Sequence, residues 1–414
     1  MGISAEELGR RLREARERVG LTQEEVAREL GISRTAVALF EAGKRKVSGL
    51  ELARLAFLYG RTPGDFFAQD LTGDGVAVLL RALPATETAE DTREAIRRGM
   101  ALAREVLNLE DLLEVERAAT ACPCYKVPVP RSSSEAVEQG NLLAHQERRR
   151  LDLGSAPVPD IGEVLERQRV VVLELRLPDS LSGFTVRFEG ERGVAVAANL
   201  AHSAERRRFS LAHEYCHVLV DHDLPGVVSR QEEQERDLRE VRANAFAAAF
   251  LMPEGGIRDY LARLRKGAPS RPREAVLSPG GQVRQVEGRF PPHARDIGIW
   301  HVCRLSAHFR VSCEAMIWRL YNLRLISGPD KDLLQEAQSR PPARTLARLL
   351  QTELATSRDG VQDRPSRLPR RVLELALDAL HRELISRRKC LELLELAGVP
   401  REEAQELLGE NYNA

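Results

Sequence analysis

Apolar residues recur every three or four positions through most of this chain, which is the spacing of helices that bury one face. Residues 7–19 carry Leu8, Leu12 and Ala15 on one side and stop before Gly20. The same spacing predicts further helices at 50–59, 63–67, 76–82, 90–118, 134–150, 160–167, 373–384 and 390–396.

Two short helices are predicted after the first one. Thr22 is followed three residues later by Glu25, the pattern of a capping box at a helix N-terminus, and Gly31 closes that helix. Ser33 is placed to cap the next helix. Two short helices joined by a glycine-containing turn form a helix-turn-helix, so residues 6–67 predict a compact five-helix unit.

A different pattern begins in the middle of the chain. The β-branched run 169–175 and the alternating segments 183–188 and 193–197 predict three short strands, with a turn at Gly190–Gly193. We expect them to form a small sheet. We also expect strand 183–188 to lie beside a cleft and to pair with an extended peptide.

These elements predict an α+β chain that is mostly helical. We expect a helix-turn-helix domain, a helical segment with a proline-rich linker, a central domain with the small sheet, a loop and helical extension, and a C-terminal helical region. Their boundaries are 1–70, 71–132, 133–265, 266–330 and 331–414. Residues 265–295 are rich in Pro, Gly and Arg and predict a flexible loop beside the cleft. The leucine stripe of helix 90–118 suits core packing and pairing with a second copy equally well.

Composition and charge narrow the possible functions. The chain has 414 residues and a formal net charge of +0, so any preference for nucleic acid must be local. Between Arg34 and Arg61 there are six basic residues and two acidic ones, which makes the helix-turn-helix locally basic. No signal peptide and no apolar run of membrane-spanning length is recognisable. We therefore expect a cytoplasmic protein that does not bind membranes.

Six cysteines are scattered along the chain. Cys122-Pro-Cys124 lacks the C-x-x-C spacing, so neither a zinc ribbon nor a disulfide framework is predicted. We expect loop cysteines at these two positions, with a redox or metal role as the alternative. Cys216 is interpreted as a small buried residue.

Residues 213–217 read His-Glu-Tyr-Cys-His. On a helix, His213 and His217 project from one face and reach one metal ion, while Glu214 lies beside the open position of that metal, as a base for a bound water. The flanking residues are apolar, which predicts a buried helix where unpaired polar groups would be costly. The pattern therefore predicts a zinc site.

A catalytic zinc needs a third protein ligand, and Glu240 on a second helix is the candidate. Asn244 lies one turn further on, where it can hydrogen-bond a ligating histidine. Two alternatives for the ligand are the acidic cluster 232–235 and the pair His222 and Asp223, which we interpret as loop residues. Manganese or iron can also occupy a His-His-Glu site.

Hydrolysis also benefits from a group that stabilises the developing oxyanion. The sequence does not choose among four residues of suitable chemistry, which are Tyr215, Tyr260, His293 and His301. The triplet Arg206–Arg208 is interpreted as a solvated entry to the helix.

The segment Leu21-Thr-Gln-Glu-Glu-Val-Ala-Arg-Glu-Leu-Gly-Ile-Ser33, followed by Phe40-Glu-Ala-Gly-Lys44, resembles Xre-type, lambda-repressor-like DNA-binding domains. It departs from them at Phe40, where tryptophan is usual, and at Arg45-Lys46-Val47, where a proline normally follows the basic residue. The resemblance implies that double-stranded DNA is contacted by Gln23, Ser33, Arg34, Thr35, Lys44, Arg45 and Lys46. The alternative is a helical docking module that does not touch DNA.

The strings Phe209-Ser-Leu-Ala-His-Glu-Tyr-Cys-His217 and Glu240-x-x-Ala-Asn-Ala-Phe-Ala-Ala-Ala-Phe-Leu-Met-Pro253 resemble the ImmA/IrrE family of metallopeptidases. The resemblance covers residues 135–330 and includes the stretch 305–320, which is similar to a winged-helix-like part of that family. Tyr215-Cys216 stands where Leu-Gly is usual, and Arg242 where a second glutamate is frequent. The resemblance implies a compact zincin-like central domain.

These observations predict a zinc-dependent metalloendopeptidase, with one zinc per chain, fused to a DNA-binding domain. Glu214 would take a proton from the activated water and pass it to the leaving amine. The resemblance implies that a repressor-like regulatory protein is cleaved to control transcription in a stress or mobile-element response. The alternative is a DNA-binding regulator whose zincin-like domain senses a ligand or partner without cleaving. A third hypothesis is an antitoxin-like binding protein, and a homodimer would suit a DNA-binding protein.

Overall fold

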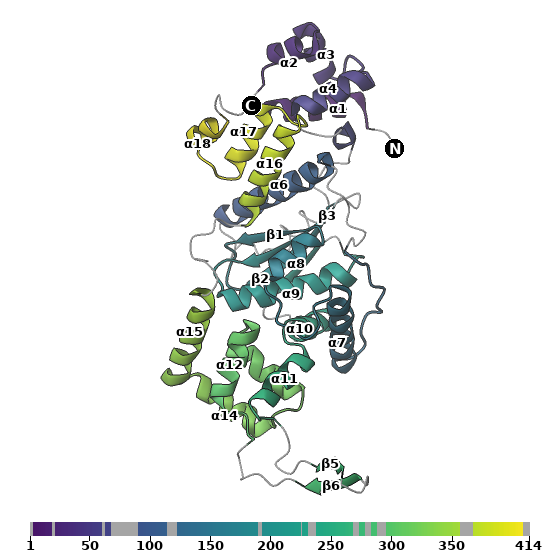
Figure 1. Ribbon diagram of the computed structural model, residues 1–414. Helices are drawn as coiled ribbons and strands as arrows, with labels where there is room; N and C mark the ends of the chain where they lie inside the picture. The colour runs from purple at the N-terminus through teal and green to yellow at the C-terminus, as the bar shows by residue number, and fades with distance from the viewer. Residues whose placement is uncertain are drawn as a thin grey trace.

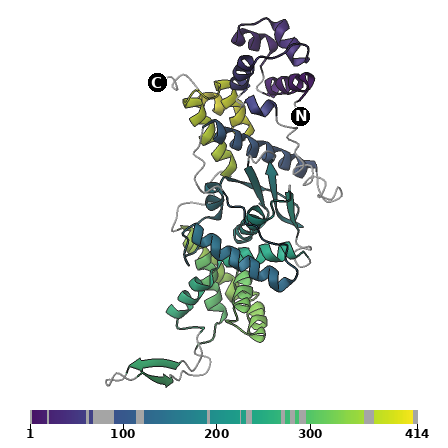
Figure 2. The ribbon, with the colours of Figure 1, turned by 90° about the vertical axis from the view of Figure 1, so that its right-hand side faces the viewer.

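The computed structural model describes most of the chain, namely residues 3–18, 21–59, 63–67, 90–113, 122–188, 193–224, 226–230, 237–267, 273–277, 283–287, 295–356 and 367–408. The molecule is elongated, with the N-terminal helices at one end and a small hairpin at the other (Figures 1 and 2). No helix of the described residues is long and apolar enough to cross a lipid bilayer.

The N-terminal unit consists of α1 (Ala5–Arg18), α2 (Gln23–Leu30), α3 (Arg34–Glu41), α4 (Gly49–Tyr59) and the 3-10 helix η1 (Pro63–Phe66). The predicted capping box of Thr22 and Glu25 is formed by two reciprocal hydrogen bonds. Gly31 ends α2 with a φ of 69°, a conformation that other residues rarely adopt. Val37 and Phe40 of α3 are buried in the core of this unit. The fifth helix predicted for this unit, at residues 63–67, is the short 3-10 helix η1.

A four-stranded sheet lies near the middle of the molecule and contains β1 (Val170–Leu175), β2 (Leu181–Phe188), β3 (Gly193–Asn199) and β4 (Gly226–Arg230). The strand order is β1-β3-β2-β4, with β1 parallel to β3 and β2 antiparallel to both of its neighbours. The three predicted strands are confirmed, whereas β4 was not predicted. The prediction that strand 183–188 pairs with a peptide is wrong, because β2 is already hydrogen-bonded on both sides.

Two cores lie on opposite faces of this sheet because alternate residues of a strand point to opposite sides. Val170 and Val172 belong to one core, and Val171 and Leu173 belong to the other. The first core is covered by α7 (Ser133–Arg150), α8 (Ile161–Arg167), α9 (Ala204–Val220) and α10 (Leu238–Leu251). The second is covered by α6 (Glu90–Leu112), α16 (Arg367–His381), α17 (Arg387–Leu396) and α18 (Arg401–Leu407).

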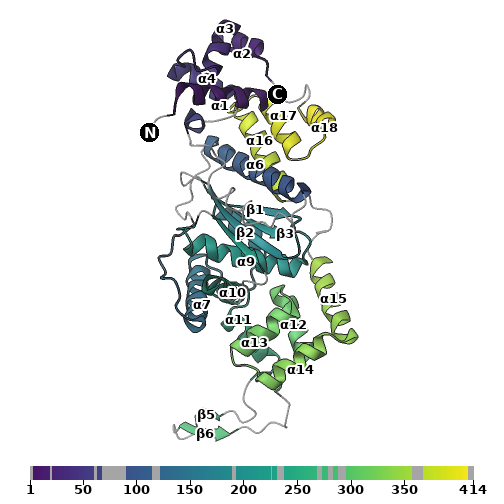
Figure 3. The same ribbon diagram turned by 180° about the vertical axis from the view of Figure 1, so that it is seen from behind.

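Segments far apart in the sequence therefore share one layer. Figure 3 shows α6 and α16 side by side on the face of the sheet opposite α9. Leu102, Val106 and Leu109 of α6 are buried in this layer, so the leucine stripe packs in the core. An ion pair of 2.9 Å between Arg371 and the buried Glu110 joins the two helices.

The helices beyond the sheet are α11 (Glu254–Arg263), α12 (Ile299–Phe309), α13 (Cys313–Asn322), α14 (Gly328–Gln338) and α15 (Pro341–Thr356). The prediction of a flexible loop over 265–295 is wrong in part, because strands β5 (Arg273–Leu277) and β6 (Val283–Glu287) form a hairpin there. The hairpin lies at the end of the molecule far from the sheet (Figures 1 and 3). Alternating residues around a Ser-Pro-Gly-Gly sequence are the pattern of such a hairpin.

Some predictions fall on residues outside the described ranges. These are the helix 76–82, the end of helix 90–118, most of the turn Gly190–Gly193, the acidic cluster 232–235 and His293.

Candidate metal centre

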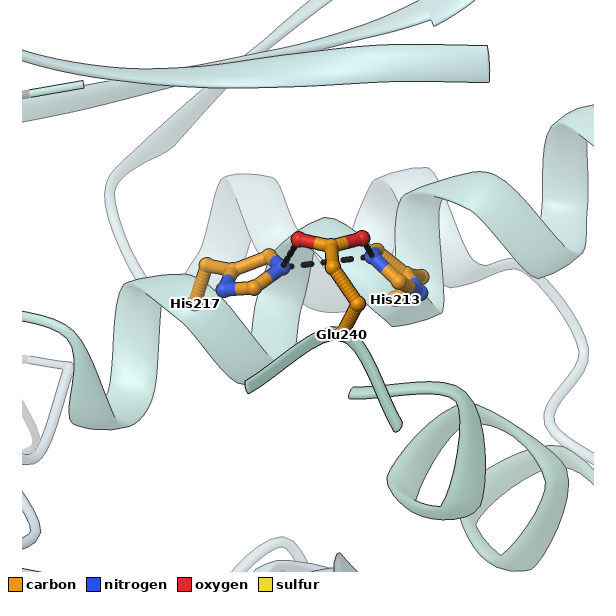
Figure 4. A group of neighbouring side chains, drawn as sticks. All are labelled: His213, His217 and Glu240. Carbon is orange, nitrogen blue, oxygen red and sulfur yellow. Dashed lines mark hydrogen bonds and ion pairs between the residues drawn. The ribbon is translucent and has the colours of Figure 1, made fainter. Parts of the chain in front are cut away.

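Two helices on one face of the sheet carry the predicted ligands. α9 begins after Ser203, whose side chain accepts a hydrogen bond from the amide of Arg206. α10 begins after Asp237, whose carboxylate accepts a hydrogen bond from the amide of Arg239. Glu240 lies in the first turn of α10, where the helix dipole favours a carboxylate. The two helices bring Glu240 over the pair of histidines (Figure 4).

The ligand atoms of His213, His217 and Glu240 converge on one point. The Nε2 atoms of the histidines lie 3.2 Å apart, and each faces one oxygen of Glu240, at 3.0 Å for His213 and 3.1 Å for His217 (Figure 4). Ligand atoms around a tetrahedral zinc, at about 2.0–2.1 Å from the metal, are roughly 3.3 Å from one another. The three side chains therefore fit a divalent ion with little movement.

Each histidine is oriented by a hydrogen bond at its other ring nitrogen. His213 Nδ1 lies 2.9 Å from Asn244 Oδ1, and His217 Nδ1 lies 2.8 Å from Asp221 Oδ2. Both partner oxygens accept, so Nδ1 carries the proton and Nε2 keeps a lone pair that can bind a metal. Asn244 thus hydrogen-bonds the ring of His213.

Asp221 was not among the predicted site residues. Its Oδ1 accepts a hydrogen bond of 2.7 Å from Arg242, whose side chain is 2% exposed. The opposite charges of the buried guanidinium and carboxylate compensate each other, and Arg242 holds Asp221 against His217. Arg242 thus positions the carboxylate that orients His217. A sequence signal for Asp221 existed, because it lies four residues after His217 and so on the same side of the helix.

Glu214 lies fully buried between α9 and β2. Thr185 of β2 donates a hydrogen bond of 2.7 Å to Glu214 Oε2, whereas Oε1 has no partner among the residues that the structure describes. A Cβ atom at Gly183 would lie 3.0 Å from that Oε1, so the glycine leaves room for it. Burial raises the pKa of the Glu214 carboxyl, which makes its ionised form a stronger base.

The electrostatics of the ligand set favour a positive charge at its centre. Burial alone would lower the pKa of His217, but hydrogen bonds to Asp221 and Glu240 raise that pKa to about 10. Burial would likewise raise the pKa of Glu240, but hydrogen bonds from His213 and His217 hold it well below its usual range. Either a proton or a divalent cation supplies this positive charge, and the two compete for the same nitrogen and oxygen atoms of the ligand set.

A cleft of about 70 Å³ opens beside these side chains. It is lined by residues of β2, α9 and α10, which are Ser182, Arg206, Phe209, Ser210, His213, Glu214 and Asn244. None of the described residues that we considered as oxyanion stabilisers lies in this lining.

Those residues have other contacts. Tyr215 is buried on the core side of α9, where its hydroxyl donates a hydrogen bond to Glu147 and its ring packs edge-on against two phenylalanines. Tyr260 packs against a histidine ring of α12, and His301 accepts a hydrogen bond from the amide of Gly298. The Tyr215-Cys216 departure from the usual Leu-Gly therefore affects the core and does not change the cleft lining.

The remaining candidates also lie apart from the ligand set. His222 bonds the carbonyl of Leu219, and Asp223 pairs with Arg239 at 3.1 Å. Cys216 is buried in the core as predicted, and all six cysteines of the chain are free thiols.

The predicted DNA-contacting residues fall into two groups. Five have exposed side chains, namely Ser33, Arg34, Thr35, Lys44 and Lys46. Gln23 donates a hydrogen bond of 2.8 Å to Glu41, and Arg45 pairs with Glu51 at 2.6 Å. These last two must therefore exchange a protein partner for a phosphate if they contact DNA.

Two regions of the chain match known protein families. Residues 165–321 match the IrrE N-terminal-like domain, and residues 7–66 match a helix-turn-helix domain. The first match contains the four-stranded sheet, α9, α10 and the cleft, and the second contains α2 and α3. No curated protein was found to match the chain.

Asp221 provides a test of how the histidines are oriented. We predict that Asp221→Asn weakens zinc affinity about 10- to 100-fold, because the amide is a poorer acceptor for His217 and leaves Arg242 without its counter-charge. Competition with a chelating dye measures the affinity, and circular dichroism checks folding. Asp223→Asn is the matched control, because its exposed carboxylate pairs only with Arg239 among the described residues. Unchanged affinity in a folded Asp221→Asn protein would contradict the assignment.

Proposed function

Because this chain joins a helix-turn-helix domain to an IrrE N-terminal-like peptidase domain, we propose that it is a zinc-dependent endopeptidase that acts on a regulatory protein. His213, His217 and Glu240 would hold the metal. The geometry that supports this assignment is the convergence of their three ligand atoms within a buried site. The same three side chains accept manganese or iron by their chemistry, and zinc is the proposal because tetrahedral His-His-Glu sites favour it.

The position of Glu214 is the main support for peptide hydrolysis. The bound metal would polarise a water molecule and the carbonyl of the peptide to be cleaved. Glu214 would accept a proton on Oε1, the oxygen that has no partner among the described residues, and pass it to the leaving amine. Thr185 would keep Oε2 fixed, so that the carboxylate rotates little between these two steps.

A non-cleaving sensor explains this arrangement less well. Burying a carboxylate with one unpaired oxygen costs free energy, and a protein that only binds a ligand gains nothing from it. A general base needs that oxygen to be free and its pKa to be raised. The arrangement therefore favours hydrolysis over sensing.

The substrate backbone would pair with β4. This strand is paired only with β2 within the described part of the sheet, so its other edge offers free amide and carbonyl groups. β4 is also next to the cleft, because the carbonyl of Ser229 in β4 accepts a hydrogen bond from Ser182 in the cleft lining. An extended peptide added to β4 would thus pass beside Glu214.

The helix-turn-helix would place the peptidase near its target on double-stranded DNA. A repressor-like protein is the proposed substrate, because a peptidase held at an operator meets DNA-bound regulators at high local concentration. Cleavage of such a protein would change transcription, in a stress or mobile-element response.

We predict that Glu214→Gln lowers kcat by about 100- to 10,000-fold while zinc stays bound, because the amide cannot accept a proton. Internally quenched peptides from a random library measure the activity, and mass spectrometry measures the metal. Glu205→Gln is the control, because that residue lies at the start of the same helix and outside the cleft lining. Hydrolysis at the wild-type rate in Glu214→Gln would rule out this residue as the base.

We predict that Arg34→Ala and Lys44→Ala both weaken binding to double-stranded DNA. Arg34 opens the recognition helix α3, so its loss is expected to relax sequence preference in a selection from random duplexes. Loss of Lys44 is expected to lower the salt dependence of binding by about one unit of slope, because one phosphate contact disappears. Arg13→Ala is the control, since Arg13 on α1 pairs with Glu17. DNA binding by both variants at wild-type strength would favour a docking module.

A further inference from the structure

The three arginines that open α9 have different surroundings. Arg207 donates a hydrogen bond of 2.8 Å to the carbonyl of His202 and lies 3.5 Å from Glu174. Arg208 donates hydrogen bonds to the carbonyls of Val158 and Pro159. Arg207 and Arg208 therefore bind other segments of the chain. The interpretation of the triplet as a solvated helix entry does not apply to these two residues.

Arg206 differs from both neighbours because its side chain lines the cleft. Its guanidinium has no hydrogen-bond or ion-pair partner in the part of the chain that the structure describes, and the residue is exposed. It is the only basic side chain in the cleft lining apart from the proposed ligand His213. A free guanidinium beside a reaction site is a binding group for an anion, and a carboxylate is the anion that polypeptides carry.

The distance along the helix places this group relative to the bond to be cleaved. Arg206 lies seven residues before His213, and each residue of a helix advances about 1.5 Å, so the two Cα atoms are about 10.5 Å apart along the axis. An extended peptide that lies along α9 advances about 3.3 Å per residue, so this span corresponds to about three residues of such a substrate. Phe209 and Ser210 lie between the two ends and line the cleft as well.

We propose that Arg206 determines specificity and selects substrates with an Asp or Glu side chain within about three residues of the cleaved bond. This inference rests on the proposed peptidase function. Arg206 touches the substrate away from the reacting atoms, so it acts on recognition and leaves the proton transfer to Glu214. A free C-terminal carboxylate has the same chemistry, and peptides with an amidated C-terminus distinguish the two sources.

The test uses the full-length zinc-loaded protein and paired peptides. Each pair differs only in an Asp or its neutral Asn counterpart at one position near the cleaved bond, and every peptide is amidated. We expect Arg206→Ala to lower kcat/KM for the Asp peptides about 10- to 100-fold and to change it little for the Asn peptides, because one charge-assisted hydrogen bond is lost. We expect Arg206→Glu to prefer Lys at the same position. Arg207→Ala is the matched control.

A binding measurement separates failure of this inference from failure of the peptidase proposal. The same labelled peptides are bound to Glu214→Gln, with and without Arg206→Ala, and followed by fluorescence anisotropy. A preference for Asp that disappears with Arg206 supports the inference even if the wild type cleaves no peptide. Equal losses on Asp and Asn peptides, the same loss in Arg207→Ala, or no preference for Asp among the amidated peptides would overturn it.

Discussion

The structure depends on the burial of four ionisable side chains at one place, which are His213, Glu214, His217 and Glu240. Charged groups in such surroundings are unstable unless they have partners. Thr185 from β2, Asp221 at the end of α9 and Asn244 from α10 supply hydrogen bonds, one to each of three of these groups. A cation between the two imidazoles and the Glu240 carboxylate would complete the compensation. Most features of the central domain serve to bring these partners together.

Close packing of the backbone keeps α9 in this position. A Cβ atom at Gly183 of β2 would lie 2.4 Å from the carbonyl oxygen of Ala197 in β3 and 3.0 Å from Glu214 Oε1 of α9, so only glycine fits between the neighbouring strand and the Glu214 side chain. A Cβ atom at Gly140 would lie 2.5 Å from the carbonyl oxygen of Arg242, which is the equivalent approach of α7 to α10. The first contact positions Glu214 in the cleft lining, and the second holds α10 against α7, which contributes no residue to that lining. The cost of loosening either contact would appear at the ligand set, because Glu240 is carried by α10.

The sequence predicted which three side chains come together in the fold, because four-residue spacing on a helix is a local property. His213 and His217 had to share one face, and the Ala-Asn pattern after Glu240 distinguished it from other acidic residues. The same spacing would have revealed Asp221, whose place after His217 resembles an ordinary loop. Local patterns also predicted the helix caps and three strands.

The features that the sequence missed depend on contacts between distant segments. β4 is a short strand whose existence follows from its pairing with β2, and this pairing made the substrate-binding prediction for β2 wrong. The layer shared by α6 and α16 joins distant residues, as in the ion pair between Glu110 and Arg371, which are 261 positions apart. The separate roles of Arg206, Arg207 and Arg208 likewise depend on which neighbours the fold provides.

The metal content of the purified protein decides whether His213, His217 and Glu240 bind a cation. Mass spectrometry on the wild type and His217→Ala, each supplied with zinc and then dialysed, gives the stoichiometry of the site. We predict about one zinc per wild-type chain and its loss in His217→Ala. A folded wild-type protein that retains no metal would contradict it and would leave the buried ligand set without the cation that its charges demand.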